Sequence, residues 1–445
     1  MTRAMKDSGV EWIGEVPEQW ILAKLKYNCT GFQNGSSQTQ LNSDISNYPV
    51  TRIETISTGK IDFDKVGYVE NINNNYLLKK NDFLISNINS IANLGNNAIF
   101  DSDRPLYHGM NLLKITPKFV YPKFLYYYFN SGIFRTNMQI LCKPAINQAS
   151  VSASNIKNIK MPFPPLPEQQ AIADYLDDKC AQIDNITATI NEQIDVLKQY
   201  KKSVITEAVT KGLNPNAPMK DSGVEWIGRI PKHWEVVKLK YALENNSEKI
   251  KVGPFGSTLK TSDYVDFGKW VYNQRTVLDN NFKSNSIFIS EEKYNLLSGF
   301  KVNEDDILIT TRGSIGKIAI VPKHFKEGIL HPCLMKFRID RVILNYQIIK
   351  HIFNNTDFIK EQFNYMSNGT TIDVIYSYNL KEIFLPVPSI HEQQAIADYL
   401  DDKCAKIDAV IADKQTQLET LAAYKKSLIY EYVTGKKSVP GFEEA

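Results

Sequence analysis

The sequence predicts an α+β protein in which two globular α/β modules are joined by two long antiparallel helices that pair like a coiled coil. Three observations lead to this fold class. The residues MKDSGVEWIG occur at positions 5–14 and again at 219–228. The residues EQQAIADYLDDKCA occur at 168–181 and again at 392–405. An apolar residue then recurs every seventh position after each copy, and unlike sequences separate the copies, so the chain is a tandem duplication with an internal pseudo-twofold repeat.

The copies divide the 445 residues into six segments, a length that suits about two to four domains. Four copied segments, together called the frame, are an N-terminal element (1–20), a central helix (161–213), a second copy of the element (214–234) and a C-terminal helix (386–445). The two unlike segments are module 1 (21–160) and module 2 (235–385).

Each copy of the N-terminal element carries two tryptophans close to a Gly and a Pro. These are Trp12 and Trp20 in the first copy, and Trp226 and Trp234 in the second. Paired large aromatic side chains are typical of an anchor that packs against a larger structure. We expect each element to clasp the helix ends and so to close the two halves on each other. Core packing within the adjoining module is the alternative.

The two helices are predicted from their apolar period. Proline-rich stretches at 162–170 and 386–394 fix where each helix begins, and Gly212 and Gly435 are placed to end them. A seven-residue period predicts a long helix with a narrow apolar seam. Lys414 interrupts the second seam. The seam residues are Leu176, Ile183, Ile190 and Leu197 in the first helix, and Leu400, Ile407, Leu421 and Leu428 in the second.

The two helices are expected to pair with each other. Each covers about forty residues, hence roughly 60 Å, and neither buries its seam alone. A tandem copy supplies a partner within the chain at high effective concentration, so we predict an antiparallel intramolecular pair. A coiled coil between two chains is the alternative.

Both modules mix short apolar runs with turn clusters and short helices. Runs such as 48–56 and 305–311 indicate strands, and 121–138 and 345–363 indicate helices, so each module is predicted to be a compact α+β unit. The aromatic run at 124–129 is expected to lie in the helix core rather than to stack on bases. The modules share this plan but differ in their polar loops.

The charge is unevenly distributed over the chain. Module 1 has 15 basic and 8 acidic residues, a net +7, and module 2 has 20 and 17, a net +3, while the frame sums to −7. Basic modules on an acidic frame suggest a polyanion as partner of the modules and a different partner for the frame. Ordinary surface scatter is the alternative.

Different polar loops on one scaffold suit the recognition of two different DNA sequences. Asparagine and glutamine pair with adenine edges, arginine and lysine with guanine, and serine and threonine with either. For any one residue, a solvated surface loop is the alternative. The candidate DNA-binding residues of module 1 are Asn34, Ser36, Gln38, Asn87, Asn89, Ser90, Asn147 and Gln148. Those of module 2 are Ser257, Thr258, Lys260, Arg275, Arg312, Ser314, Lys317, Thr370 and Thr371.

The sequence contains no recognisable active-site pattern. The GSIGK stretch at 313–317 fails the phosphate-loop pattern, because Thr311 and Ile318 stand where Gly and Ser or Thr are required. The five cysteines form no C-x-x-C pair, and the six histidines form no H-E-x-x-H. We therefore expect no catalytic residue, no metal and no cofactor. No apolar run is long enough to span a membrane and the start does not resemble a secretory signal, so we expect a cytoplasmic protein.

The frame resembles the specificity subunit of type I restriction-modification systems. The residues that carry the likeness are SGVEWIGEVPEQW with SGVEWIGRIPKHW, and PLPEQQAIADYLDDKCAQID with PSIHEQQAIADYLDDKCAKID. In module 2, GPFGSTLK (253–260), DDILITTRGSIG (305–316) and SNGTTI (367–372) resemble recognition-domain motifs of that family. Module 1 departs from the family pattern, because it lacks the GPFGS and TRG stretches.

This resemblance implies that each module is a target-recognition domain for one half of a bipartite DNA sequence. The helices would act as spacers that fix the gap between the half-sites. They would also dock two methyltransferase subunits and, through them, the restriction and translocation subunits. Adenine methylation and ATP-driven cleavage would belong to these partners, so this chain would be non-catalytic. A stand-alone nuclease or methyltransferase, and a scaffold that binds no DNA, are the alternatives from other classes.

Overall fold

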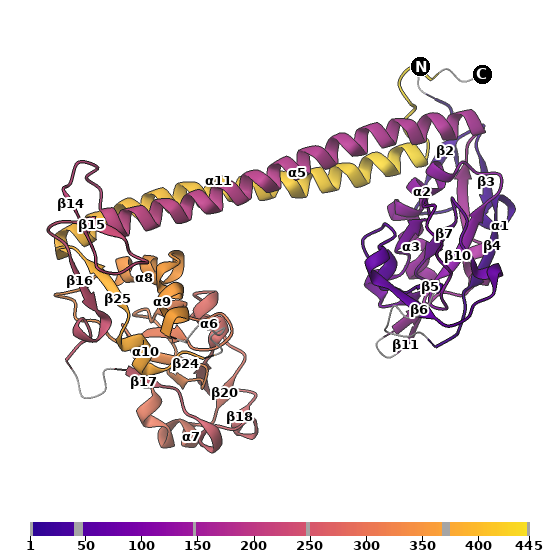
Figure 1. The fold of residues 1–445 in the computed structure, drawn as a ribbon. Helices are drawn as coiled ribbons and strands as arrows, with labels where there is room; N and C mark the ends of the chain where they lie inside the picture. Colours follow the sequence, from indigo (N-terminus) through magenta and orange to yellow (C-terminus); the bar gives the residue numbers. More distant parts are fainter. Residues whose placement is uncertain (1–2, 40–47, 146–147, 246–249, 367–373, 443–445) are drawn as a thin grey trace. The chain divides into compact units, whose positions relative to one another are not determined.

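The computed structural model describes residues 3–39, 48–145, 148–245, 250–366 and 374–442, and it divides into two compact units (Figure 1). Unit 1 comprises Met1–Asn191 and Gln415–Ala445, and unit 2 comprises Glu192–Lys414. Each unit contains one N-terminal element, one module, the first half of one long helix and the second half of the other. No helix in these described ranges is long and apolar enough to cross a membrane.

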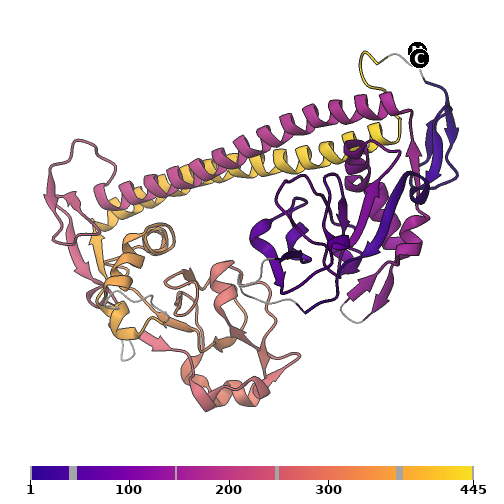
Figure 2. The same cartoon turned by 45° about the vertical axis from the view of Figure 1, so that its right-hand side comes forward.

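The long helices are α5 (Leu166–Lys211) and α11 (Ile390–Val433). Both end as predicted, because Gly212 and Gly435 adopt positive φ angles of 74° and 71° directly after them. The views agree that the first half of α5 lies along the second half of α11 in unit 1, and that the converse holds in unit 2 (Figures 1 and 2).

Copied ion pairs fix the antiparallel direction of the helix pair. Lys425 Nζ lies 2.6 Å from Asp184 Oδ1 in unit 1, and Lys201 Nζ lies 2.6 Å from Asp408 Oδ2 in unit 2. Asp184 and Asp408 are the same position of the repeat, as are Lys201 and Lys425. The predicted intramolecular antiparallel pair is therefore confirmed.

The heptad seam lies between the paired helices. Lys414, which replaces an apolar residue there, donates to Gln193 Oε1 at 2.6 Å. Its long side chain keeps the charge at the helix surface, so the interruption leaves the pair intact. Six seam residues are buried, Leu176, Ile183, Ile190, Leu400, Ile407 and Leu428, and two are half-buried, Leu197 and Leu421.

The N-terminal element is a short antiparallel hairpin in both copies. β1 (Met5–Asp7) pairs with β2 (Glu15–Pro17), and β14 (Met219–Asp221) pairs with β15 (Arg229–Pro231) in the same register. The Asp7 side chain accepts a hydrogen bond from the backbone N–H of Gly9 at 2.9 Å, and the Asp221 side chain accepts the same bond from Gly223 at 2.9 Å. These bonds form the tight turns that begin the chain reversal.

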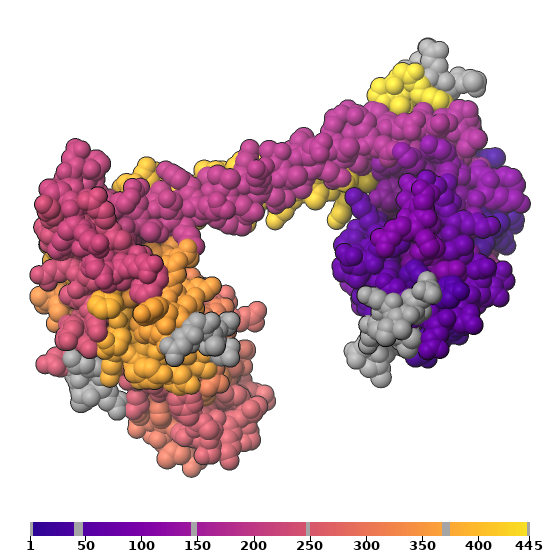
Figure 3. Space-filling view, in the orientation of Figure 1, coloured from indigo at the N-terminus to yellow at the C-terminus, as the bar shows by residue number. Residues whose placement is uncertain are grey.

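The first and last strands of each module pair with each other next to a long helix. β3 (Ile21–Lys24) pairs with β13 (Lys160–Phe163) in module 1, and β16 (Glu235–Lys238) pairs with β25 (Phe384–Val387) in module 2. Because β13 and β25 run directly into α5 and α11, both ends of each module are held at the start of a long helix. The space-filling view shows module 1 packed against α5 (Figure 3).

Module 1 is built on a four-stranded antiparallel sheet with the order β4-β10-β7-β9. Helices α2 and α3 pack on it, and Phe83 and Ile115 of the sheet share one buried core with Phe124 and Phe134 of the helices. The sheet strands are β4 (Cys29–Asn34), β7 (Phe83–Ile85), β9 (Asn97–Ile99) and β10 (Leu113–Pro117). The helices are α1 (Leu25–Asn28), α2 (Pro122–Asn130), α3 (Gly132–Leu141) and α4 (Ala153–Lys157). Smaller sheets use β5 (Tyr48–Thr51), β6 (Val66–Val69), β8 (Ile88–Asn89), β11 (Lys143–Ala145) and β12 (Gln148–Ser150).

Module 2 repeats this plan and adds a second sheet. Its main sheet has the order β17-β24-β21-β22, and the second has the order β18-β20-β19-β23 with one parallel pair, β19 with β23. The main strands are β17 (Ile250–Val252), β21 (Ile307–Thr310), β22 (Ile318–Ile320) and β24 (Leu334–Phe337). The second sheet has β18 (Tyr264–Val265), β19 (Lys269–Tyr272), β20 (Phe288–Ile289) and β23 (Gly328–Leu330). The helices are α6 (Gln274–Leu278), α7 (Glu291–Leu296), α8 (Tyr346–Asn355), α9 (Phe358–Met366) and α10 (Ser377–Lys381).

The helix predicted over 121–138 is two helices in the structure. Ser131 between α2 and α3 is extended, with φ −76° and ψ 155°, and its Oγ donates to the Tyr128 carbonyl at 2.6 Å. This bond satisfies a carbonyl at the end of α2, so the chain can turn there and lay a second helix on the sheet. The segment 345–363 breaks in the same way between α8 and α9. The aromatic run is helix core as predicted, with Phe124 and Tyr128 fully buried.

Candidate nucleic-acid interface

A buried tryptophan joins each N-terminal element to the first turn of a long helix. Trp20 Nε1 donates to Glu168 Oε2 at 2.8 Å, at the start of α5. Trp234 Nε1 donates to Glu392 Oε1 at 3.0 Å, at the start of α11. Both indoles are fully buried. An indole has a single N–H, and when buried it requires a partner, which the copied glutamate supplies here.

The same tryptophans also contact the end of the opposite helix. A Cβ added at Gly435, just after α11, would lie 2.9 Å from Trp20 Cη2, and one added at Gly212, just after α5, would lie 3.1 Å from Trp234 Cζ2. Each tryptophan therefore lies between the start of one helix and the end of the other. The predicted contact with the helix ends is confirmed, and the alternative also holds, because Trp20 and Trp234 belong to the core of the adjoining module. The other two tryptophans, Trp12 and Trp226, are half-buried and pack against the same cores.

A copied glutamine attaches each module to its helix. Gln169 Oε1 accepts from the Tyr121 backbone N–H at 2.8 Å, and Gln393 Oε1 accepts from the Asn345 N–H at 2.8 Å. Tyr121 and Asn345 are the N-caps of α2 and α8. Both modules are thus held by the same bond at the same place. This role is not among the predictions from the sequence, although the EQQ triplet repeated at 168–170 and 392–394 was a signal for it.

Three candidate residues of module 1 lie at or beside strand ends: Asn34 ends β4, Asn89 ends β8, and Asn87 lies between β7 and β8. The Asn34 amide donates to the Asn87 side-chain oxygen at 3.2 Å and to the Met110 carbonyl at 2.9 Å, while buried Asn87 donates to the Val151 carbonyl at 3.1 Å. The Asn89 amide donates to Ser86 Oγ at 3.0 Å. These bonds shape the loops, so the amides of Asn34 and Asn87 act within the module.

Other candidates in module 1 border solvent. Gln38 and Ser90 are exposed, and Ser36 is buried beneath Gln38. Ser36 and Gln38 line a cavity of about 330 Å³ together with Thr51, Arg52 and Asn111, three polar residues that the sequence analysis did not select. Strand β12 pairs with β8 and so brings the backbone of Gln148 to the Asn89 strand. Asn147 and the side chain of Gln148 lie outside the described residues.

Two arginines of module 2 lie near each other. The Gln274 amide at the start of α6 donates to the Arg312 carbonyl at 3.0 Å, which brings Arg312 to the helix that carries Arg275. Both arginine side chains are exposed, and Arg275 Nε lies 3.8 Å from Asp279 Oδ2. Guanidinium groups on an exposed edge can contact phosphates or guanine edges.

A cavity of about 350 Å³ lies beside Arg275. It is lined by Asn273, Thr276, Asn281, Ser284 and Asn285 among others, a set that the sequence analysis did not select. Asparagine and serine predominate in this lining, as they do among the candidate residues of module 1. The Asn-rich stretch DNNFKSNS at 279–286 was the available signal.

The remaining candidates of module 2 occupy different environments. Ser257, Thr258, Lys260 and Ser314 are exposed. Lys317 Nζ donates to the Asn354 carbonyl at 2.5 Å, near the end of α8, and burial lowers the pKa of its ammonium. A cation at a helix C-terminus complements the carbonyls there, so Lys317 acts within the module. Thr370 and Thr371 lie outside the described residues.

The described residues contain no group of three or more His, Cys, Asp or Glu side chains placed to hold a metal ion. Amides and hydroxyls make up most of the polar lining of the two cavities described above, together with one arginine and one carboxylate in each, Arg52 and Glu54 in module 1 and Arg275 and Asp279 in module 2. The fold and these surfaces define a class of protein in which two binding modules are displayed on a frame of two paired helices.

The particular family follows from comparison with known proteins. A family model described as "Type I restriction modification DNA specificity domain" matches residues 20–196 and 231–420. The matches cover most of the chain, which therefore belongs to the type I restriction-modification specificity family. Members of this family are the recognition subunits of type I restriction enzymes, and this chain is a non-catalytic specificity subunit.

Individual relatives agree with this assignment. The chain is 33% identical over 436 residues to the putative type I restriction enzyme MjaX specificity subunit of Methanocaldococcus jannaschii, covering 95% of each. It is 21% identical over 435 residues to the type I restriction enzyme EcoKI specificity subunit of Escherichia coli (strain K12), covering 95% of this chain and 90% of that one.

Solved structures share the fold. A chain of the structure described as "Structural basis underlying complex assembly and conformational transition of the type I R-M system" matches with a TM-score of 0.70 at 16% identity, over 95% of this chain and 99% of that chain. The HsdS subunit from Thermoanaerobacter tengcongensis matches with a TM-score of 0.50 at 15% identity, over 97% of this chain and 100% of that chain.

Proposed function

We propose that this specificity subunit reads a bipartite DNA sequence, with one half-site for each module. The observation that carries the proposal is that two modules of one plan, with unlike polar loops, are attached by identical bonds to a repeated frame. A copied attachment presents both modules in the same way, while the unlike loops select different base sequences. Each mismatched base pair typically costs about 1–3 kcal/mol, so two half-sites multiply the discrimination.

The exposed candidates are the proposed DNA contacts. In module 1 these are Gln38 and Ser90, and in module 2 they include Arg275 and Arg312. Amide and guanidinium groups read base edges in the major groove, and hydroxyls and lysines position the phosphates. Ser257, Thr258, Lys260 and Ser314 belong to the second group, and Asn147, Gln148, Thr370 and Thr371 stay in the proposal on sequence grounds.

The frame would set the gap between half-sites and dock the catalytic partners. α5 and α11 each contribute to both units, so their length is the natural ruler between the modules. The exposed faces of the copied helix segments carry the same acidic residues, Asp174 and Asp178 in α5, and Asp398 and Asp402 in α11. A repeated exposed surface suits two copies of one partner. We propose two methyltransferase subunits at these surfaces, with restriction subunits joined through them, and a cytoplasmic location.

A module exchange tests the proposal. Residues 21–160 would be replaced by the corresponding module of another specificity subunit, and methylated adenines would be mapped across the genome of cells that express it with its methyltransferase. One half-site should change, and the other half-site and the gap should stay the same. The matched exchange of residues 235–385 should change the other half-site. A change in both half-sites after a single exchange would overturn the modular assignment.

A further inference from the structure

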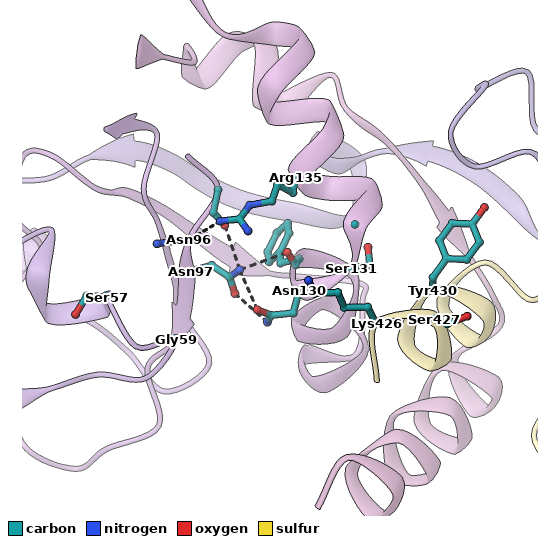
Figure 4. A pocket seen from close by; sticks show the side chains of 13 residues that line it. Ser57, Gly59, Asn96, Asn97, Asn130, Ser131, Arg135, Lys426, Ser427 and Tyr430 are labelled. Carbon is teal, nitrogen blue, oxygen red and sulfur yellow. Dashed lines mark hydrogen bonds between the residues drawn. The ribbon is translucent and has the colours of Figure 1, made fainter. Parts of the chain in front are cut away.

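A cavity of about 470 Å³ lies in unit 1 where module 1 meets α11 (Figure 4). Module 1 contributes the loop before β9 and the start of α3, and α11 contributes Lys426, Ser427 and Tyr430. The figure shows Lys426 extending from α11 toward Asn130. All of these residues belong to unit 1, so the cavity is internal to it.

The cavity is lined by two cations and by several neutral polar groups. Arg135 Nη2 donates to the Ala92 carbonyl at 2.7 Å and to Asn96 Oδ1 at 3.1 Å, which holds the guanidinium at the cavity wall. Of the described lining residues none is acidic, and within the described chain Lys426 has no ion-pair partner. A guanidinium has five N–H donors, so Arg135 retains capacity for an external acceptor.

Unit 2 contains a related cavity of about 440 Å³, lined by Gly316, Phe363 and Lys360 among others. The two cavities can be aligned because each is lined by a glycine of positive φ, Gly95 in unit 1 and Gly316 in unit 2. A Cβ on Gly95 would lie 3.2 Å from Met138 Cγ of α3, and a Cβ on Gly316 would lie 3.3 Å from Phe363 Cε2 of α9. Met138 therefore corresponds to Phe363, and the same register places Gly132 at the position of Asp357.

With the two cavities aligned in this way, the unit 2 cavity has a carboxylate, Asp357, at a position where the unit 1 cavity has Gly132. In unit 2, Asp357 Oδ2 lies 2.5 Å from Lys202 Nζ of α5. Lys202 and Lys426 are the same position of the repeated YKKS segment. In unit 1, Gly132 brings no carboxylate, and a Cβ added there would meet no atom within 4 Å. Unit 1 therefore keeps the lysine, Lys426, but has no carboxylate at this position to pair with it. Open space lies at Gly132, where unit 2 has the Asp357 side chain.

We propose that the unit 1 cavity binds a phosphate of the DNA backbone, held by Lys426 and Arg135. This inference rests on the proposed DNA recognition and adds a backbone contact from the frame helix itself. A phosphate diester offers an anionic oxygen to each cation, and charge-assisted bonds to Arg and Lys are the strong class of hydrogen bond. In unit 2 the Asp357 carboxylate pairs with Lys202 instead, and Lys317 of that cavity donates to the Asn354 carbonyl.

The test introduces a carboxylate into the unit 1 cavity, where it would occupy the place proposed for the DNA phosphate. Gly132→Asp gives unit 1 the carboxylate that unit 2 has, at the first residue of a helix where an acidic side chain is favourable. Lys426→Gln removes the cation, and Lys202→Gln is the matched control in unit 2. The readout is binding of a mixed-sequence DNA duplex to the full-length chain in complex with its methyltransferase subunits, over a series of salt concentrations.

Gly132→Asp and Lys426→Gln should each lower the slope of log affinity against log salt by about 0.9, the value for one phosphate contact. Lys202→Gln should leave the slope unchanged, and thermal unfolding should show that Gly132→Asp is folded. An unchanged slope in both unit 1 variants would overturn the inference while leaving DNA recognition intact. A wild-type complex that binds no DNA would overturn the proposed function itself.

Inorganic phosphate separates a DNA contact from a site for a free anion. If phosphate raises the unfolding temperature of the wild-type chain but not of Gly132→Asp, and the DNA salt slope is the same in both, the cavity is a free-anion site and the DNA assignment is wrong. Loss of the slope in Gly132→Asp supports the DNA assignment whether or not free phosphate also binds.

Discussion

The Trp20 indole donates to Glu168 in unit 1, and the same carboxylate accepts from Arg3 Nη2 at 2.6 Å. The copied pair in unit 2, Trp234 with Glu392, has a histidine, His233, in place of the arginine, at 3.0 Å. The Glu168 side chain is 5% exposed and that of Glu392 is 29% exposed. The two clasps are therefore alike in geometry but different in how completely they bury charge.

The difference in burial predicts unequal effects of one substitution. Glu168→Gln leaves the Arg3 guanidinium buried beside a neutral group and should lower the free energy of unfolding by about 3–5 kcal/mol. Glu392→Gln breaks a partly solvated contact and should cost about 1 kcal/mol or less. Urea unfolding of the two variants measures both values. Equal losses would show that the buried arginine contributes nothing to the clasp.

The glycine after α11 is predicted to be sensitive to substitution. Gly435 has φ 71°, and a Cβ there would lie 2.5 Å from Pro17 Cδ. Gly435→Ala should lower the free energy of unfolding by about 2–4 kcal/mol, because a left-handed conformation and a backbone displacement add together.

Gly9→Ala is the matched control for this substitution. Gly9 has a similar φ of 64° with no atom within 4 Å of an added Cβ, so its cost should be about 1–2 kcal/mol. Urea unfolding compares the two variants. If they lose the same amount, the contact with the N-terminal element does not constrain the end of α11.

His108 predicts a dependence of stability on pH. Burial lowers its pKa from 6.5 to about 4, and its Nε2 lies 2.9 Å from the Leu112 carbonyl in the loop that holds Asn34. The unfolded chain binds the proton more readily, so this contribution is fully present above about pH 6.5 and is lost as the pH falls toward about 4.

The size of this effect can be isolated with one variant. His108→Gln keeps an amide donor for the Leu112 carbonyl but does not titrate. The wild-type chain should lose up to about 3 kcal/mol more than His108→Gln between pH 7 and pH 4, measured by urea unfolding at each pH. Parallel profiles would mean that folding does not change the pKa of His108.

The frame was predictable because the repeat and the heptad period specify it directly. A seam residue such as Leu176 is buried by a partner helix with the same pattern, and Gly212 ends a helix by its own backbone freedom. The break at Ser131 was not predictable, since one extended residue inside an apolar helical run leaves the periodicity on both sides unchanged.

The roles of individual loop residues were harder to predict from the sequence. Asn87 was selected for its amide, which the structure directs to the Val151 carbonyl, and Lys317 was selected for its charge, which reaches the Asn354 carbonyl. Both partners are distant in the sequence, so composition and spacing carry no signal for these bonds. Composition identified which loops are polar, and tertiary contacts decide which polar groups face solvent.

The proposed ruler predicts the effect of shortening both helices together. Deletion of residues 189–195 and 413–419 removes one heptad from α5 and one from α11, and it keeps Lys201 opposite Asp408 and Lys425 opposite Asp184. At 1.5 Å per residue the frame becomes about 10 Å shorter, which corresponds to about three base pairs at 3.4 Å each. The gap between half-sites should shorten by about that number while both half-site sequences persist, as mapped by adenine methylation. Deletion of 189–195 alone is the control, because it makes the two helices unequal in length, so the Lys201–Asp408 and Lys425–Asp184 pairs cannot both form and the helix pair should be destabilised. A folded double-deletion subunit that methylates sites with the original gap would show that the helices do not set the spacing.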